Sequence, residues 1–179
     1  MKSELREIIK SDKDRGYENG FGRKPIQLRY LIAWRKASFY NKKSLMGILY
    51  RIRLRTLSEK SGIQIPTETK IGKGLLIAHF GTIIINPSVV MGENVNIAPG
   101  LVIGKANRGE RKGTPVIGNC VWIGAGAVIT GNIHIGNDVL IAPNAFVNFD
   151  VPDHSVVIGN PAEIHHKENA TEGYINHKV

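Results

Sequence analysis

Aliphatic residues recur every six positions along the second two-thirds of the chain. Each is usually followed by Gly, Ala or Asn, and a second aliphatic or small residue often stands four positions later. The main series consists of Ile71, Ile77, Ile85, Met91, Ile97, Ile103, Ile117, Ile123, Ile129, Ile135, Ile141 and Val147. Six residues make one short strand and one turn, so three units close a triangular coil. The pattern predicts a stack of such coils, a parallel β-helix. It contains no helical period of the kind that alternates with strands in dinucleotide-binding folds.

The six-residue spacing breaks at two places. Ile77 and Ile85 are eight residues apart, so two extra residues interrupt the repeat close to His79. Ile103 and Ile117 are fourteen residues apart, so eight extra residues form a polar loop within the stretch GKANRGERKGTPV. Insertions into a solenoid are common places for binding loops. We therefore expect the chemistry of the protein at these two breaks.

The chain before the repeats follows a helical pattern instead. Within SLMGILYRIRLRTL, one helix face gathers the apolar residues Leu45, Ile48, Leu49 and Ile52. Two interpretations stay open, because basic amphipathic helices serve both roles. The helix either docks on the neighbouring domain with its arginines in solvent, or it binds a surface. We expect a helical region at 1–62, the β-helix at 63–166 and a C-terminal tail at 167–179.

The positive charge of the chain is concentrated in one segment. The formal net charge is +9, and residues 23–60 hold eleven of the 24 Lys and Arg but only one acid, Glu59. Such a segment is expected to face something anionic. No nucleic-acid-binding motif is present, which favours peripheral membrane contact through residues 23–60 or a lipid-linked substrate. One cysteine and the lack of a long apolar run indicate a cytoplasmic protein, with the inner face of the membrane as its peripheral site.

His79 stands within the apolar run IAHFGTIIIN, where two interpretations compete. A single histidine on a hydrophobic stretch is more often a hydrogen-bonded core residue than a functional group. An imidazole titrates near pH ~6.5, however, so at neutral pH it can accept the proton of a hydroxyl. Because His79 lies at a break of the repeat, we favour its interpretation as a general base.

Three stretches between residues 63 and 166 are distinctive. They are IGKGLLIAHFGTIII, GTPVIGNCVWIGAGAVITGNIHIGNDVLIAPNAFV and DVPDHSVVIGNPAEI. Together they resemble the hexapeptide-repeat acyltransferases, and within them the serine O-acetyltransferase-like branch. The resemblance implies a left-handed β-helix, a homotrimer with active sites between subunits, and acetyl-CoA as co-substrate, with no metal. It also implies that His79 is the general base of a direct transfer within a ternary complex.

The same resemblance assigns roles to further positions. It implies coenzyme contacts for Gly104, Lys105, Ala125, Gly126, Ala142, Pro143, Gly159, Asn160 and Pro161. It implies acceptor contacts for Gln64, Asn86, Arg111 and Thr114. A backbone N–H near Gly104 or Lys105 would stabilise the oxyanion of the transition state.

Several acceptor positions depart from the serine acetyltransferase pattern. Those enzymes carry an aspartate fifteen residues before the base, where this chain has Gln64, and another directly before it, where this chain has Ala78. Gly113 and Thr114 stand where they carry Arg-His. We therefore expect the acceptor to be a sugar, free or as a lipid-linked glycan. That places the chain with O-acetyltransferases of exopolysaccharide and capsule biosynthesis of the colanic acid type, which share its LYRI segment.

Two other functions stay open. One is a serine O-acetyltransferase of cysteine biosynthesis with a rebuilt acceptor site. The other is a trimeric scaffold without activity, which the retained His79 argues against. A zinc site of the kind found in β-helical carbonic anhydrases is not expected, because Val139 rather than a histidine stands five residues after His134.

Overall fold

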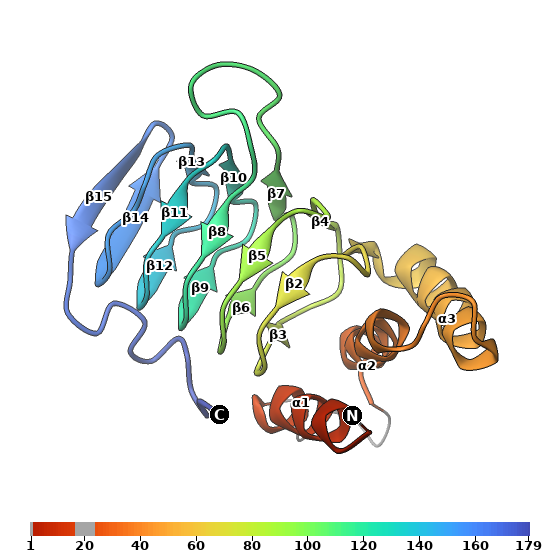
Figure 1. The fold of residues 1–179 in the computed structure, drawn as a ribbon. Coiled ribbons are helices and arrows are strands. Elements are labelled where there is room, and N and C mark those ends of the chain that lie inside the picture. The colour runs from red at the N-terminus through yellow and green to blue at the C-terminus, as the bar shows by residue number, and fades with distance from the viewer. Residues whose placement is uncertain (1, 17–23) are drawn as a thin grey trace.

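The structure, a computed structural model, describes residues 2–16 and 24–179 and consists of a helical end followed by a β-helix (Figure 1). The helices are α1 (Lys2–Asp14), α2 (Ile26–Phe39) and α3 (Leu45–Ser61). The basic segment predicted at 23–60 begins at a residue outside the described ranges. None of the helices in those ranges is long and apolar enough to cross a bilayer.

Three sheets of short strands wind around one axis. Sheet A holds β1 (Ile63–Gln64), β4 (Ile83–Ile85), β7 (Val102–Gly104), β10 (Val128–Thr130) and β13 (Phe146–Val147). Sheet B holds β2 (Lys70–Ile71), β5 (Val90–Met91), β8 (Val116–Ile117) and β11 (His134–Ile135). Sheet C holds β3 (Leu76–Ile77), β6 (Asn96–Ile97), β9 (Val121–Ile123), β12 (Val139–Ile141), β14 (Ser155–Gly159) and β15 (Ala162–His166). The pairs are parallel, except that β15 returns antiparallel beside β14.

The strand register confirms both breaks in the repeat. Ile117 lies opposite Ile135, eighteen residues later, which is the length of three regular units. Ile77 lies opposite Ile97, twenty residues later, so this coil contains the two extra residues near His79. Ile97 in turn lies opposite Ile123, twenty-six residues later, because this coil contains the long loop. The insertions leave the stacking of the coils intact.

The aliphatic residues of the repeat form the core of the β-helix. Ile77, Ile103, Ile123 and Ile141 are fully buried, and so are the second-series residues such as Leu101. Burial of one such side chain contributes about 1.5–3 kcal/mol, and every coil repeats the contribution on each face. The predicted fold class is confirmed: the chain is a left-handed parallel β-helix preceded by an α-helical region.

A buried ion pair joins the helical end to the first coil. Arg35 of α2 binds Asp12 of α1 through Nε at 2.8 Å and Nη2 at 3.0 Å. The same guanidinium donates to the carbonyl oxygens of Ile71 at 2.7 Å and Gly72 at 2.6 Å. Asp12 also accepts the backbone N–H of Leu75 at 3.0 Å. Two charged side chains therefore satisfy the polar backbone at the open end of the coil.

Helix α3 packs on α2 with the side opposite to the one that its apolar pattern predicts for docking. The residues that α3 buries include Gly47 and Leu57, and Arg51 donates to the carbonyl of Ala37 at 2.6 Å. The predicted docking face, by contrast, is exposed: Leu45 by 72%, Ile48 by 46%, Leu49 by 50% and Ile52 by 61%. The expectation that this face docks on the neighbouring domain is wrong, because α3 packs through its other side, where Leu54 and Leu57 join the core and Arg51 bonds to Ala37.

The C-terminal residues fold back along sheet C. Asp138 accepts hydrogen bonds from the Thr171 hydroxyl at 2.6 Å and from the Ala170 N–H at 3.0 Å. The ring of Tyr174 packs on Trp122 with their centroids 4.8 Å apart. The tail thus ends beside α1 (Figure 1), and Asn176 accepts a hydrogen bond from Arg15.

Candidate active site

One edge of the β-helix collects the turns that lead from sheet C to sheet A, and we call it the C–A edge. Its turns lie around residues 78–82, 98–101, 124–127 and 142–145. They are tied to one another by backbone hydrogen bonds: Gly100 N to Thr82 O at 2.6 Å, Gly126 N to Pro99 O at 3.0 Å, and Asn144 N to Ala125 O at 2.9 Å. The edge is therefore a continuous, regular ridge of backbone.

His79 lies on the first turn of the C–A edge. Its side chain is exposed, as are those of its neighbours Ala78 and Phe80, the last by 64%. Among residues 2–16 and 24–179 no hydrogen bond to the ring is found. His79 is thus not a core histidine, and its imidazole is free to meet a substrate.

Backbone contacts fix the turn that carries His79. Ala78 donates to Ile97 O at 3.0 Å, and Gly81 donates to Ser61 O at 2.8 Å. The carbonyl of Ala78 also accepts a bond from the side chain of Gln27 in α2 at 3.4 Å. Gly81 has φ +141°, and a Cβ there would lie 2.9 Å from the Cβ of Pro99. Glycine is therefore required where the two extra residues rejoin the coil.

Most residues that the resemblance assigns to the coenzyme lie in one row on the C–A edge. Ala125 and Gly126 occupy its third turn, and Ala142 and Pro143 its fourth. The turn between β14 and β15, with Gly159, Asn160 and Pro161, follows directly because Ala142 donates to Val157 O at 2.8 Å. Side chains along the row are small. Four steps of about 4.8 Å between neighbouring coils give the row a length of roughly 19 Å from the His79 turn.

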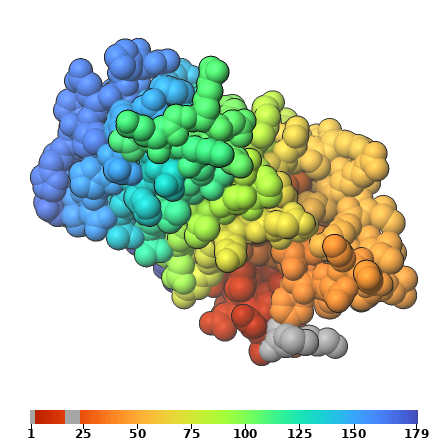
Figure 2. All heavy atoms as spheres, turned by 45° about the horizontal axis from the view of Figure 1, so that its top comes forward, coloured from red at the N-terminus to blue at the C-terminus, as the bar shows by residue number. Residues whose placement is uncertain are grey.

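The remaining assigned residues gather at the opposite edge of sheet A, the A–B edge. Gly104 ends β7 and Lys105 begins the long loop, which projects from the surface (Figure 2). Asn86 follows β4 and accepts the N–H of Ser88 at 3.0 Å, and the carbonyl of Ser88 accepts the Thr114 hydroxyl at 3.2 Å. Since β4 lies between this edge and the His79 turn, the two are separated by at least roughly 10 Å. One chain does not bring these residues to His79.

The long loop is held close to the coil at its base. Ala106 and Gly113 pair in an antiparallel bridge. Arg111 donates to Asp150 at 3.4 Å, and its carbonyl accepts the N–H of Asn132 at 2.9 Å. The Arg111 side chain is therefore held beside the A–B edge, away from His79 of the same chain.

Gln64 lies apart from the other predicted acceptor residues, on β1 beside α3. Its side chain is exposed and lines a groove of about 360 Å³ between the helices and the first coil. The groove is also lined by Arg51, Arg55 and Ser58 of α3. The end of the same helix accepts the N–H of Gly81 from the His79 turn. Gln64 thus has cationic neighbours that its place in the sequence does not reveal.

The other histidines do not form a metal centre. His134 is exposed on β11, and His154 binds Asp138 through Nδ1 at 2.9 Å. Across residues 2–16 and 24–179, no group of three or more His, Cys, Asp or Glu side chains is arranged to hold a metal ion.

Sequence reasoning missed two contributions to the edge and the groove. The first is the second turn of the row, Ala98 and Pro99, which the repeat itself could have identified because Ile97 precedes it. The second comes from the helical region, namely Gln27 and Arg55. No repeat connects that region with the β-helix, so only the tertiary structure reveals these contacts.

Comparison with known proteins agrees with this arrangement. Residues 114–148 match the model of the bacterial transferase hexapeptide (six repeats). A serine acetyltransferase of Helicobacter pylori is 38% identical over 103 residues, covering 58% of this chain and 60% of the relative. The chain spans at most 60% of the length of the first relatives it matches.

Solved structures are similar over almost the whole chain. Soybean serine acetyltransferase complexed with serine has a TM-score of 0.76 at 27% identity, covering 90% of this chain and 69% of that one. Serine acetyltransferase of Brucella abortus in complex with coenzyme A has a TM-score of 0.73 at 26% identity, covering 91% and 66%.

These findings correct the expected acceptor. The relatives and structures named above are serine acetyltransferases, and none is an O-acetyltransferase of exopolysaccharide or capsule biosynthesis. The prediction of a sugar or lipid-linked glycan acceptor is therefore wrong. It rested on the uncharged residues Gln64, Ala78, Gly113 and Thr114, and it left out the arginines that α3 places beside Gln64.

Proposed function

We propose that the chain is an acetyl-CoA-dependent O-acetyltransferase whose acceptor is the hydroxyl of L-serine. The observation that carries the proposal is the C–A edge, where an exposed histidine begins a straight row of small side chains. A row of roughly 19 Å suits a long, narrow thioester that lies along it with its acyl group at His79. The similarity to structures solved with coenzyme A and with serine supports both substrates.

The chemistry required of the chain is a proton transfer. The imidazole of His79 accepts the proton of the serine hydroxyl while the oxygen attacks the thioester carbonyl. The new C–O bond forms, the C–S bond breaks, and the histidine returns the proton to the departing sulfur. The products are O-acetylserine and free coenzyme A. Because both substrates meet in one complex, no covalent intermediate with the protein is needed.

The oxyanion of the transition state requires a hydrogen-bond donor. Gly104 and Lys105, assigned to this role by resemblance, lie on the A–B edge. A second copy that sets its A–B edge against the C–A edge of the first would supply them. Such a head-to-tail contact closes into a ring, and three copies make a homotrimer. The loop cations Lys105 and Arg111 would then face the neighbouring site.

The groove beside Gln64 supplies the charge that a zwitterionic acceptor requires. Arg51 already donates to Ala37 O and Thr67. Arg55 is bound only to Glu59 among the described residues, through an exposed pair at 3.1 Å, which is weak in water. Arg55 is thus available to bind the carboxylate of serine through a charge-assisted hydrogen bond.

The test is release of coenzyme A thiol from acetyl-CoA in the presence of L-serine. We expect Arg55→Ala to raise the KM for L-serine by roughly tenfold or more, since hydrogen bonds to charged groups contribute about 1.5–3 kcal/mol. The KM for acetyl-CoA should not change. Arg53→Ala, from the same helix but outside the groove, is the matched control. Absence of thiol release with L-serine would refute the proposal.

We further propose that the exposed face of α3 contacts an anionic membrane surface. The face combines large apolar side chains with a basic surround, formed by Leu45, Met46, Ile48, Leu49 and Ile52 together with Lys42, Lys43 and Arg53. Apolar side chains inserted at the headgroup level and cations beside them are the two contributions that such helices use. A symmetric contact between two copies would oppose like charges instead.

Sedimentation with lipid vesicles tests this contact. The protein should pellet with vesicles that contain phosphatidylserine and not with vesicles of phosphatidylcholine alone, and Ile48→Ser with Ile52→Ser should abolish pelleting. Equal binding to neutral vesicles, or a change of oligomeric state in the double variant, would contradict the membrane contact.

A further inference from the structure

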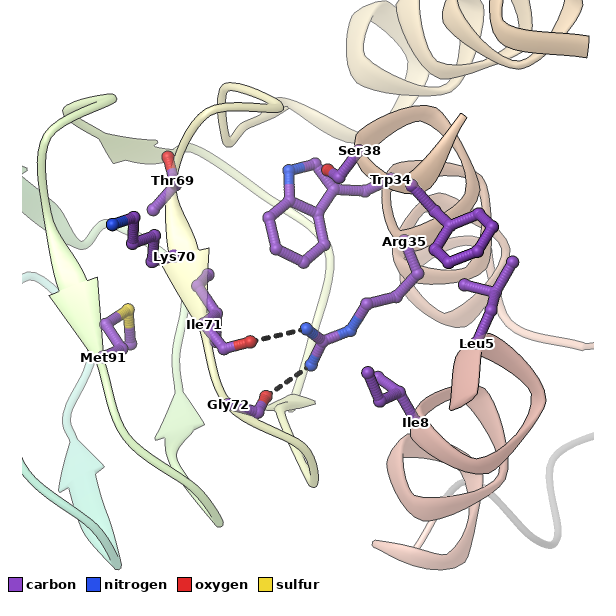
Figure 3. A pocket seen from close by; sticks show the side chains of 11 residues that line it. Leu5, Ile8, Trp34, Arg35, Ser38, Thr69, Lys70, Ile71, Gly72 and Met91 are labelled. Carbon is purple, nitrogen blue, oxygen red and sulfur yellow. Dashed lines mark hydrogen bonds between the residues drawn. The ribbon is translucent and has the colours of Figure 1, made fainter. Parts of the chain in front are cut away.

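A pocket separate from the C–A edge lies where the helical end meets sheet B (Figure 3). Its volume is about 380 Å³, within the size range of small-molecule sites. It is lined by Leu5 and Ile8 of α1, by Trp34, Arg35, Ser38 and Phe39 of α2, and by Thr69, Lys70, Ile71, Gly72 and Met91 of the first two coils. None of these residues belongs to the row that begins at His79. The pocket is therefore a second concave site of the molecule.

The walls of this pocket are mainly aromatic and aliphatic. The indole of Trp34 lies between the strand that carries Ile71 and the helices (Figure 3), and only 2% of this residue is exposed. Met91 closes the pocket from the second coil. Aromatic rings and a thioether favour a flat, polarisable ligand.

The polar groups of the pocket are mostly occupied by other residues. The guanidinium of Arg35 binds Asp12. It also donates to the carbonyls of Ile71 and Gly72 (Figure 3). The indole N–H of Trp34 donates to Pro66 O at 2.9 Å. Because the Arg35 charge is balanced by Asp12, the interior of the pocket presents no net charge.

Thr69 is the exception. Its residue is only 4% exposed, and its Oγ1 is the one buried side-chain N or O atom in the described residues without a hydrogen-bond partner. A buried hydroxyl left unpaired costs free energy, which a ligand group would recover by pairing with it. At the mouth stand two exposed polar side chains, Ser38 and Lys70. The wall of the pocket thus combines apolar side chains with one buried, unpaired hydroxyl.

We propose that this pocket binds a small monocyclic aromatic molecule that carries a hydroxyl group. The ring packs against Trp34 and Met91, and the hydroxyl pairs with Thr69. The proposal does not depend on the acetyl-transfer activity, since no residue of the pocket takes part in it.

Phenol and benzene are the matched probes, because they differ by the hydroxyl alone. The chain has two tryptophans, Trp34 and Trp122, so a Trp122→Phe background reports on the pocket through Trp34 emission. The protein is used in its full length and native assembly. We expect saturable quenching with phenol binding about fivefold to tenfold more tightly than benzene, the range of one hydrogen bond to a buried group.

Two variants separate the contributions of shape and hydroxyl. Thr69→Val keeps the β-branched shape and should equalise the two probes while leaving benzene affinity within about twofold. Ile8→Phe should fill the pocket and abolish binding of both. Thermal melting followed by circular dichroism verifies that each variant is folded. We expect Thr69→Val to melt no lower than the parent, because it removes the unpaired hydroxyl.

Three results would overturn the proposal. The first is the absence of saturable Trp34 quenching in the native assembly, which includes the case of a neighbouring copy filling the pocket. The second is unchanged binding in a folded Ile8→Phe variant. The third is a phenol preference that survives Thr69→Val.

Discussion

The β-helix and the helical region are stabilised by different kinds of contact. In the β-helix the same aliphatic contact recurs in every coil, with residues such as Ile103 and Ile129 fully buried. The helical region also buries apolar side chains, such as Leu31 and Trp34, but it adds a few non-repeated polar contacts, above all the buried pair of Asp12 and Arg35. A repeated contact distributes stability over many residues. A single buried pair concentrates it on two, because removing one partner leaves the other charge unpaired.

The two regions also differ in what they bring to the proposed chemistry. The β-helix places His79 at a break in its own repeat. The helical region adds Gln27, which donates to the carbonyl beside the histidine, and the arginines of the groove. On this comparison the β-helix should determine the rate of the reaction, and the helices should determine the affinity for the acceptor.

Replacing His79 should have the largest effect. His79→Ala removes the proposed base, so acetyl transfer should fall by ~10²–10⁴, with affinity for coenzyme A within a few-fold by calorimetry. His134→Ala, which removes another exposed histidine of the β-helix, should leave the rate unchanged. A His79→Ala enzyme that keeps one-tenth of the parental kcat would show that the edge does not contain the base.

Breaking the buried pair should have the next largest effect. Arg35→Met leaves Asp12 without its cation and should lower the free energy of unfolding by about 3–5 kcal/mol. Urea denaturation followed by circular dichroism and by Trp34 fluorescence measures the change. The double variant Asp12→Asn with Arg35→Met should recover part of the loss. If the double variant is less stable than Arg35→Met alone, the loss of stability does not come from the unpaired charge of Asp12.

A conservative change in the repeat should cost less. Ile129→Val removes one methylene from a fully buried position and should lower the free energy of unfolding by about 0.5–1.5 kcal/mol. The outward-facing Val128→Ala on the same strand serves as its control and should cost less still. If Ile129→Val lowers the free energy of unfolding as much as Arg35→Met does, stability is not more distributed in the β-helix than in the helical region.

The smallest effect concerns the attachment of the C-terminal tail at acidic pH. Burial alone would raise the pKa of Asp138, but hydrogen bonds from Thr171, His154 and the backbone of Ala170 outweigh it and lower that pKa from 3.8 to about 2. A lowered carboxyl pKa stabilises the folded state above the unfolded pKa, and the benefit is lost as the pH falls towards 2.

Hydrogen exchange at the amides of Ala170 and Thr171 follows this attachment. Their protection in the parent should approach that of Asp138→Asn as the pH falls from about 4 to about 2. The hydrogen bond to Asp138 raises the pKa of His154. The contribution of protonated His154 to the stability of the folded state is therefore present at low pH and is lost as the pH rises through that raised pKa. If amide protection in the parent and in Asp138→Asn differs by the same factor at every pH, titration of Asp138 does not control the attachment of the tail.

The sequence determined the β-helix almost completely. The positions of the inward residues, the two breaks and the exposed histidine at one of them all follow from a six-residue period. Each coil contacts only its neighbours, so local spacing is sufficient. The same spacing explains why Ala125, Gly126, Ala142 and Pro143 share one edge, since turns eighteen residues apart must stack.

Only the tertiary structure decided how the helices sit on the first coil. Helical periodicity identified an apolar face on α3 but not the side that packs, which is the side where Leu54 and Leu57 join the core and Arg51 donates to the carbonyl of Ala37. These contacts join residues far apart in the chain, which no local pattern encodes. The groove beside Gln64 forms at that junction, so the uncharged residues of the β-helix alone led to the wrong expected acceptor. The fold and the exposed position of His79 are local properties of this sequence, whereas the groove beside Gln64 depends on long-range contacts between the helices and the first coil.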